Sequence, residues 1–186
     1  MICVKRNLKW GESLVAFNVD AELIGLWFQG QKYFPKNMDD VLWIEEDEAT
    51  VDQLVSKKIK KVIKEFDRQM SEYQAGTRKE FNLPLSPVGS SFRQLVWEEL
   101  LKIPLGETTT YGCLSKKIAA AKGLDSMSAQ AVGGAVGHNP ISIIIPCHRV
   151  VGASGQLTGY AGGIDKKTAL LQHEGISVNT QSLSLT

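Results

Sequence analysis

The sequence predicts an α+β fold, in which a β-rich N-terminal domain precedes a mainly α-helical C-terminal domain. Short apolar, β-branched runs with polar or glycine breaks between them occupy residues 1–34, which is typical of strands. Later segments place apolar residues every three or four positions, which is typical of helices. A strand-rich part followed by a helix-rich part is typical of the α+β class. We expect domains at 1–86 and 87–175, and a flexible tail at 176–186.

The N-terminal domain begins with three predicted strands, Met1–Val4, Leu14–Val19 and Leu23–Phe28. Trp10 and Trp27 are expected to pack in the core, because no polar residues are spaced with them to form a site.

A long amphipathic helix is predicted next, and Gly76 is its expected end. Thr50 and Gln53 stand at capping-box spacing at its start. One face carries an apolar stripe: Val51, Leu54, Val55, Ile59, Val62, Ile63, Phe66, Met70 and Tyr73. The other faces carry Lys57, Lys58, Lys60, Lys61 and Lys64. These lysines are more typical of a solvated face than of a DNA contact. Residues 77–89 hold two prolines and a glycine without periodicity, and we interpret them as the linker.

The second domain opens with a helix predicted to be capped by Ser91, with Gln94 three residues later. Thr110 is the expected cap of a helix from Tyr111 to about Lys122. A short polar break separates it from a second helix over 128–136, and this pair is compatible with a helix-turn-helix.

The helix over 128–136 consists mostly of alanine and glycine. Gly133 and Gly134 weaken it, because each glycine costs a helix about 1 kcal/mol relative to alanine. Close approach of another backbone would explain the glycines. The partner could be a neighbouring protein element or the walls of a nucleic-acid groove, and composition alone slightly favours the protein.

The stretch with the clearest chemical potential is Ile141 to Arg149. We predict a buried strand over Ile141–Ile145 that runs into Pro146 and Cys147. His148 and Arg149 follow at once, and such neighbours can stabilise a thiolate, the nucleophilic form of cysteine. The alternative is that Cys147 is a small buried hydrophobic residue, as free cysteines often are. The residues alone leave both open.

The rest of the chain holds a glycine-rich loop with Tyr160, suited to close contact with a ligand. A helix is predicted over Ile164–His173 and ends before Gly175. The tail is uncharged and rich in serine and threonine, so we expect it to fray.

Composition limits the remaining possibilities. The net charge of +1 neither favours nor excludes nucleic acid. Three widely spaced cysteines without a C-x-x-C, and three histidines without zinc-finger spacing, indicate no disulfide framework and no metal site. We expect no cofactor. No apolar run approaches the length of a membrane span. We expect a cytoplasmic monomer that does not contact membranes.

Six motifs follow one another along the chain: TTTYG, AVGG, NP, IIIPCHRVVG, GYAGG and LLQHEG. Their order and spacing resemble the O6-alkylguanine-DNA alkyltransferases, also called methylated-DNA–protein-cysteine methyltransferases. The resemblance is strong over residues 87–175 and mainly architectural over 1–86. It implies a small ribonuclease-H-like N-terminal domain, a winged helix-turn-helix in the second domain, and duplex DNA containing O6-alkylguanine as partner. O4-alkylthymine stays open as a second substrate.

The resemblance also implies roles for the catalytic residues. Cys147 matches the acceptor thiol, which keeps the alkyl group after one event. His148 matches the histidine that acts on the thiol through a water, and Glu174 the glutamate that orients this histidine. Asn139 matches the asparagine that braces the turn before the active-site segment. Tyr111 matches the tyrosine that donates to the purine N3.

Further matches concern the base pocket and the DNA. The carbonyl oxygens of Cys147 and Val150 match those that receive the guanine amine. Tyr160 and Ala161 match the pocket wall, and Lys167 the lysine near it. The small-residue helix matches the element that enters the minor groove while the base is flipped out. The expected DNA-contacting residues are Thr110, Ala129, Gln130 and Gly133.

The chain differs from the family pattern at two of these positions. Gln130 stands where many relatives have an arginine, and Ala161 where some have serine. Cys3 alone does not supply the N-terminal zinc site of some relatives. Arg149 is expected to be mainly structural, bracing loops near the site.

Two other functions stay in view. One is a non-catalytic module that binds alkylated DNA or regulates DNA. The other is a Cys-His-Glu hydrolase, which would turn over repeatedly.

Overall fold

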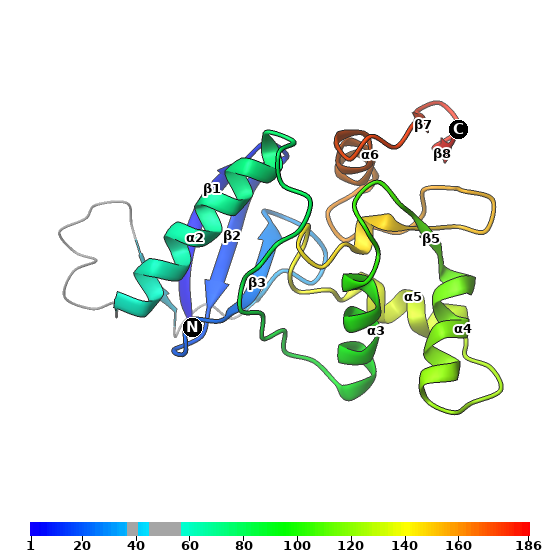
Figure 1. The fold of residues 1–186 in the computed structure, drawn as a ribbon, viewed down its shortest axis with the longest axis horizontal. Coiled ribbons are helices and arrows are strands. Elements are labelled where there is room, and N and C mark those ends of the chain that lie inside the picture. Colours follow the sequence, from blue (N-terminus) through cyan, green and yellow to red (C-terminus); the bar gives the residue numbers. More distant parts are fainter. Residues whose placement is uncertain (37–40, 45–56) are drawn as a thin grey trace. The chain divides into compact units, whose positions relative to one another are not determined.

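The computed structural model describes residues 1–36, 41–44 and 57–186. They form two compact units, Met1–Val88 and Gly89–Thr186 (Figure 1). The first is built on a sheet and the second mainly on helices, so the predicted α+β class is confirmed. In the described ranges, no helix combines the length and the apolar character that a membrane crossing requires.

A four-stranded mixed sheet forms the first unit. Its strands are β1 (Ile2–Leu8), β2 (Gly11–Phe17), β3 (Leu23–Phe28) and β4 (Leu42–Trp43), in the order β3-β2-β1-β4. β1, β2 and β3 pair antiparallel, and β4 pairs parallel to β1. β1 is longer than predicted, because polar side chains such as Lys5 and Asn7 alternate onto its exposed face.

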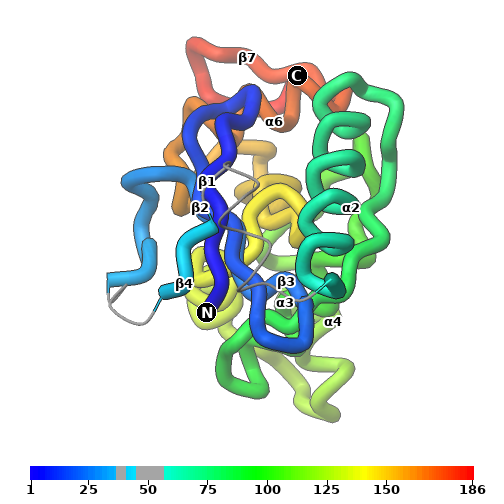
Figure 2. The backbone as a smooth tube through the Cα atoms, turned by 90° about the vertical axis from the view of Figure 1, so that its left-hand side faces the viewer, coloured from blue at the N-terminus to red at the C-terminus, as the bar shows by residue number. Residues whose placement is uncertain are grey.

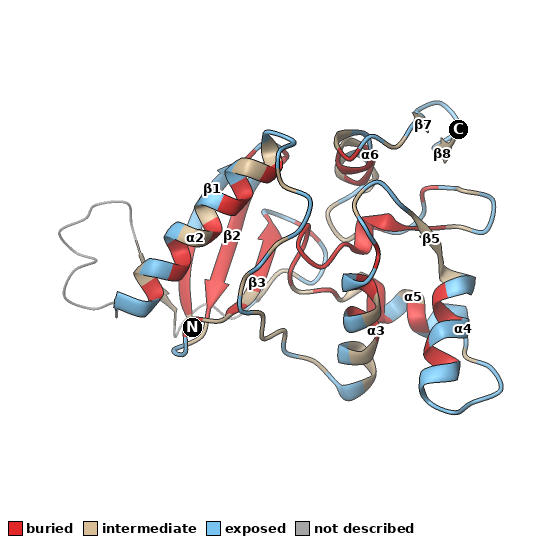
Figure 3. Ribbon diagram, in the orientation of Figure 1, coloured by how far each residue is buried: buried red, intermediate tan, exposed pale blue. Residues whose placement is uncertain are grey.

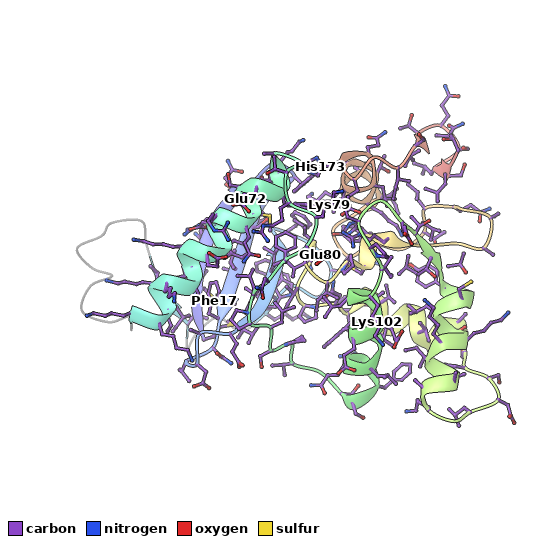
Figure 4. All side chains as sticks on the ribbon, in the orientation of Figure 1. Phe17, Glu72, Lys79, Glu80, Lys102 and His173 are labelled. Carbon is purple, nitrogen blue, oxygen red and sulfur yellow. The ribbon has the colours of Figure 1, made fainter. Side chains whose placement is uncertain are left out.

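Helix α2 (Lys57–Gln74) lies along one face of this sheet (Figures 1 and 2). Phe17 of β2 packs edge-on against Phe66 of α2, with ring centroids 6.4 Å apart (Figure 4). Only the sheet-facing stripe of α2 is buried, as the predicted periodicity requires (Figure 3). The predicted cap at Thr50 and Gln53 lies outside the described residues.

The segment interpreted as a linker is held against the first unit. The Gln69 side chain of α2 accepts from the backbone N–H of Asn82 at 2.8 Å and donates to its carbonyl at 2.9 Å. Leu85 forms a bridge with Leu23 of β3. Residues 82–86 are therefore not a free tether, which a count of prolines could not reveal.

The second unit contains four α-helices: α3 (Ser91–Leu101), α4 (Tyr111–Ala121), α5 (Ala129–Gly137) and α6 (Ile164–His173). The predicted cap of α3 is wrong by one residue, because Ser90 accepts from the Arg93 N–H at 3.4 Å. The cap predicted at Thr110 is confirmed. The indole N–H of Trp97 in α3 donates to Ala135 O in α5 at 3.0 Å and joins these helices.

A short parallel pair brings two distant segments together. β5 (Thr109–Thr110) pairs with β6 (Val150–Val151), in register Thr109 with Val150. β6 follows directly on a 3-10 turn, η1 (Cys147–Arg149). The pairing therefore places the first turn of α4 beside the segment that carries Cys147.

The C-terminal residues adopt structure that their composition did not predict. β7 (Val178–Asn179) pairs antiparallel with β8 (Ser184–Leu185). The Leu157 N–H donates to Leu183 O at 2.7 Å, and the Leu185 N–H donates to Gly155 O at 3.0 Å. The expectation of a frayed tail overlooked these contacts, because Leu185 and its apolar neighbours pack against a small core of Val151, Leu157 and Leu171.

Candidate functional site

The residues before Cys147 form a buried turn, so the strand predicted over Ile141–Ile145 is wrong. Asn139 is the reason. Its Oδ1 accepts from the Ile141 N–H at 3.0 Å, and its Nδ2 donates to Ile145 O at 2.7 Å. Ile143 has a φ of 70°, which is strained for a β-branched residue. The apolar run supplied β propensity, but the Asn139 side chain holds its backbone in a turn.

Cys147 begins η1 with its thiol buried. The Asn139 Nδ2 donates to Cys147 Sγ at 3.0 Å. Burial raises the pKa of the Cys147 thiol, and the Asn139 hydrogen bond and the positive Lys167 oppose that rise. The same asparagine therefore shapes the turn and favours the thiolate.

His148 and Glu174 form a pair with fully buried side chains. The His148 Nε2 lies 2.9 Å from Glu174 Oε1. Burial lowers the pKa of His148, against the raising effect of Glu174, so the ring is neutral at pH 7. A neutral ring that donates from Nε2 leaves Nδ1 as an acceptor. Nδ1 is buried and has no hydrogen-bond partner among the residues that the structure describes.

Arg149 makes a two-pronged contact with the same carboxylate. Its Nε donates to Glu174 Oε2 and its Nη2 to Glu174 Oε1, both at 2.8 Å. Its Nη1 donates to Ile103 O at 2.5 Å, which matches the expected bracing of loops. Burial raises the pKa of Glu174, but the bonds from His148 and Arg149 outweigh it, so the pKa lies well below its ordinary value. Sequence reasoning missed this contact, because the two residues lie far apart in the chain.

Tyr111 opens α4 and reaches the glycine-rich loop. Its hydroxyl donates to Thr158 O at 3.2 Å and Gly159 O at 3.3 Å. Burial and the nearby Cys147 raise its pKa, so the phenol keeps its proton at neutral pH. A Cβ on Gly133 of α5 would lie 3.6 Å from the Tyr111 ring. The glycine thus faces a side chain of the protein and not another backbone.

Lys167 of α6 is fully buried beneath the same loop. Its Nζ donates to Val150 O at 2.6 Å and Thr158 O at 2.9 Å. Burial lowers its pKa to about 8, and the Cys147 charge opposes this. The Val150 carbonyl that the resemblance offers to a guanine amine already accepts from Lys167, and only its second lone pair is left for a ligand.

The other predicted positions lie on the loop and on α5. Tyr160 is buried and Ala161 is half-buried. Along α5, Ala129, Gln130, Ala131 and Gly134 are exposed, whereas Val132, Ala135 and Val136 are buried. One face of α5 therefore presents almost no side chain beyond Cβ except at Gln130. The Thr110 Oγ1 accepts from the Cys113 N–H at 3.1 Å and is engaged as a helix cap.

A separate cavity of about 530 Å³ lies in the first unit, lined in part by Lys5, Glu12, Phe34 and Trp43. None of its lining residues belongs to the cluster around Cys147. Chemistry places the candidate site at the thiol, because nucleophile, base and buried charges converge there. Within residues 1–36, 41–44 and 57–186, no group of three or more His, Cys, Asp or Glu side chains is placed to hold a metal. Cys3, Cys113 and Cys147 are free thiols.

An α+β protein with a buried free cysteine next to a buried histidine–carboxylate pair is the class that this fold and site define. Comparison with known proteins narrows the class. A family model for the DNA-binding domain of 6-O-methylguanine DNA methyltransferase matches residues 91–176. A methylated-DNA–protein-cysteine methyltransferase of Methanosarcina acetivorans is 49% identical over 112 residues, 60% of this chain and 69% of that protein. The chain belongs to the methylated-DNA–protein-cysteine methyltransferase family.

Mycobacterium tuberculosis supplies two further matches, one to a sequence and one to a solved structure. Its methylated-DNA–protein-cysteine methyltransferase is 53% identical over 106 residues, 57% of this chain. The match spans only 61% of that relative's length. The crystal structure of M. tuberculosis OGT in complex with DNA has a TM-score of 0.76 and 35% identity, covering 94% of this chain and 92% of that one.

Proposed function

We propose that the protein repairs DNA by transferring the alkyl group of O6-alkylguanine irreversibly to Cys147, once per molecule. One observation carries the proposal: the buried Cys147 thiol accepts a hydrogen bond from Asn139 and is followed directly by the buried His148–Glu174 pair. A thiol so placed is a nucleophile with a base at hand. Family membership supplies the substrate class, because the relatives are methylated-DNA–protein-cysteine methyltransferases.

The chemistry balances without a cofactor. The thiol proton passes through a water to Nδ1 of His148, and Glu174 stabilises the imidazolium that forms. The thiolate sulfur attacks the alkyl carbon, a C–S bond forms, and the C–O6 bond breaks. Its electron pair moves onto the purine. Tyr111 donates a proton to N3, so that guanine leaves neutral and Cys147 keeps the thioether.

The damaged base must leave the duplex to reach a buried thiol, which costs a few kcal/mol. In our proposal α5 enters the minor groove, where the exposed Ala129 and the half-buried Gly133, neither with a side chain beyond Cβ, permit close approach. Gln130 occupies the gap left by the flipped base, and Thr110 lies at the start of the neighbouring helix. Tyr160 and Ala161 wall the base pocket, while the carbonyls of Cys147 and Val150 receive the guanine amine.

We also propose a compartment, an oligomeric state and a domain division for the protein. It acts as a cytoplasmic monomer, consistent with three free thiols. Residues 1–86 and 87–175 act as domains, the second of which holds the complete chemistry.

Intact-mass spectrometry tests the proposal. Incubation with an excess of duplex DNA containing O6-methylguanine should add one methyl mass to the peptide bearing Cys147, after which the reaction stops. Cys147→Ala should stay unmodified. DNA that binds tightly yet keeps its methyl group would instead identify a lesion-binding module. Repeated turnover of an ester would identify a hydrolase.

A further inference from the structure

Three donors converge on one buried carboxylate beside the reactive thiol. Glu174 Oε1 accepts from His148 Nε2 at 2.9 Å and from Arg149 Nη2 at 2.8 Å, and Oε2 accepts from Arg149 Nε at 2.8 Å. The side chains of His148 and Glu174 are fully buried and that of Arg149 is 9% exposed. Arg149 thus supplies two of these three hydrogen bonds and a countercharge to the carboxylate.

Burial is the main cause of the lowered pKa of His148, and the charge balance of this cluster acts together with it. A buried carboxylate without a countercharge favours proton uptake, either by itself or by the imidazole bonded to it. With Arg149 in place, carboxylate and guanidinium cancel, and the ring stays neutral. Without Arg149, one proton would restore neutrality, and His148 is positioned to take it. A protonated ring has no lone pair with which to accept the thiol proton.

We propose that Arg149 is a positioning residue of the alkyl transfer, which fixes Glu174 so that His148 stays a neutral Nε2–H tautomer with Nδ1 available as base. The inference rests on the proposed function for its consequence in catalysis. Its structural half, the tautomer and charge of His148, can be measured without DNA.

Arginine suits this task better than lysine. Two parallel N–H···O bonds fix the plane of the carboxylate, whereas an ammonium would act as a point charge. The third arm of the guanidinium donates to Ile103 O, just after α3, and prevents the fork from rotating. The turn after α3 is thereby connected to the orientation of the catalytic base.

The other titratable groups near the cluster contact different partners. Lys167 of α6 donates to Val150 O and Thr158 O, and Tyr111 of α4 donates to Thr158 O and Gly159 O. Cys147 accepts from Asn139. Burial lowers the pKa of His148 most, and the positive charges of Arg149 and Lys167 lower it further. Removal of Arg149 therefore changes the charge beside His148 and leaves these hydrogen bonds of Lys167 and Tyr111 in place.

The test compares Arg149→Gln, Arg149→Lys and a matched control, Arg6→Gln. The Arg6 guanidinium makes the same two-pronged contact with Asp67 in the first unit, at 2.7 and 2.9 Å. Histidine ¹⁵N NMR would follow the tautomer and titration of His148 in each protein. Methyl-transfer rates on duplex DNA would be recorded against pH.

In Arg149→Gln we expect His148 to titrate about one pH unit higher, with the acid limb of the transfer rate shifted equally. At a given pH on that limb, the variant should transfer the methyl group about tenfold more slowly than the wild type, because a shift of one pH unit changes the neutral fraction of His148 about tenfold. Arg149→Lys should keep the midpoint and lose rate through geometry alone. Arg6→Gln should shift neither.

A purely structural role for Arg149 would lower the melting temperature and leave the His148 titration unchanged, which would overturn the inference. A shift of similar size in Arg6→Gln would overturn it as well. If the wild-type protein fails to methylate itself while the NMR shift appears as expected, the proposed function fails and the assignment of Arg149 to His148 stands.

Discussion

Asn139 serves the site through both ends of its side-chain amide. The oxygen accepts from the Ile141 N–H, and the nitrogen donates to Ile145 O and to Cys147 Sγ. These atoms are buried, so each bond that is lost would leave a polar group unsatisfied. Stability of the turn and reactivity of the thiol are therefore linked in one residue.

We predict that Asn139→Ala lowers the free energy of unfolding by about 2–4 kcal/mol, because buried backbone groups lose their partners. It should also raise the pKa of Cys147 further, since the donor that favours the thiolate is gone. Methyl transfer at pH 7 should slow accordingly. Urea unfolding and a pH series of transfer rates would measure both effects.

The variant Asn139→Asp provides a comparison with Asn139→Ala. It keeps the acceptor for the Ile141 N–H but loses the donors and adds a negative charge near sulfur. Its stability should lie below that of the wild type, and its thiol pKa above those of both the wild type and Asn139→Ala. Wild-type transfer rates in either variant would contradict the role of Asn139 at the thiol.

Single residues differ in how far the sequence could predict them. The bracing role of Asn139 was predicted only through the resemblance to the alkyltransferase family. The two-pronged contact of Arg149 with Glu174 depends on packing between η1 and the end of α6, which no local sequence pattern encodes. The contact of Lys167 with Val150 O likewise requires the fold.

At the scale of elements, helices were predicted best because their signals are local. The cap Thr110 and the apolar spacing of α4 and α6 act within a few residues. The segment over Ile141–Ile145 failed because one side chain overrides its propensity. The β7–β8 pair was missed because it forms only against Gly155 and Leu157. Its strands are too short to be recognised alone.

The exposed face of α5 permits a test that separates stability from function. At Gly134 an added Cβ would meet nothing within 4 Å. Gly134→Ala should therefore stabilise the protein by about 0.5–1 kcal/mol through helix propensity. If α5 enters the minor groove, the added methyl group should at the same time weaken binding to duplex DNA. Calorimetry and fluorescence anisotropy would measure the two quantities.

Ala131→Gly provides the opposite change on the same exposed face. It should destabilise the helix by a similar amount and add no bulk toward DNA. A Gly134→Ala protein that is more stable and binds duplex DNA as tightly as wild type would contradict the proposed placement of α5.

At the scale of the whole molecule, the two units differ in where their perturbed titratable groups lie. The second unit buries His148 and Glu174, both with lowered pKa values. In the first unit, Glu65 and Glu72 have lowered pKa values through their bonds with arginines at the surface. Both carboxylates lose their contribution only as the pH falls below their ordinary value of 4.5. The units should therefore respond differently to mild acid.

We predict that only the second unit weakens between pH 6.5 and 4.5. As the pH falls below 6.5, the ordinary pKa of histidine, the unfolded chain binds a proton at His148 that the folded unit does not bind. The folded state loses up to about 1.4 kcal/mol per pH unit. Hydrogen exchange resolved by peptide would follow each unit. His148→Gln, which retains an N–H for Glu174, should abolish the slope, whereas parallel weakening of the first unit would contradict this assignment.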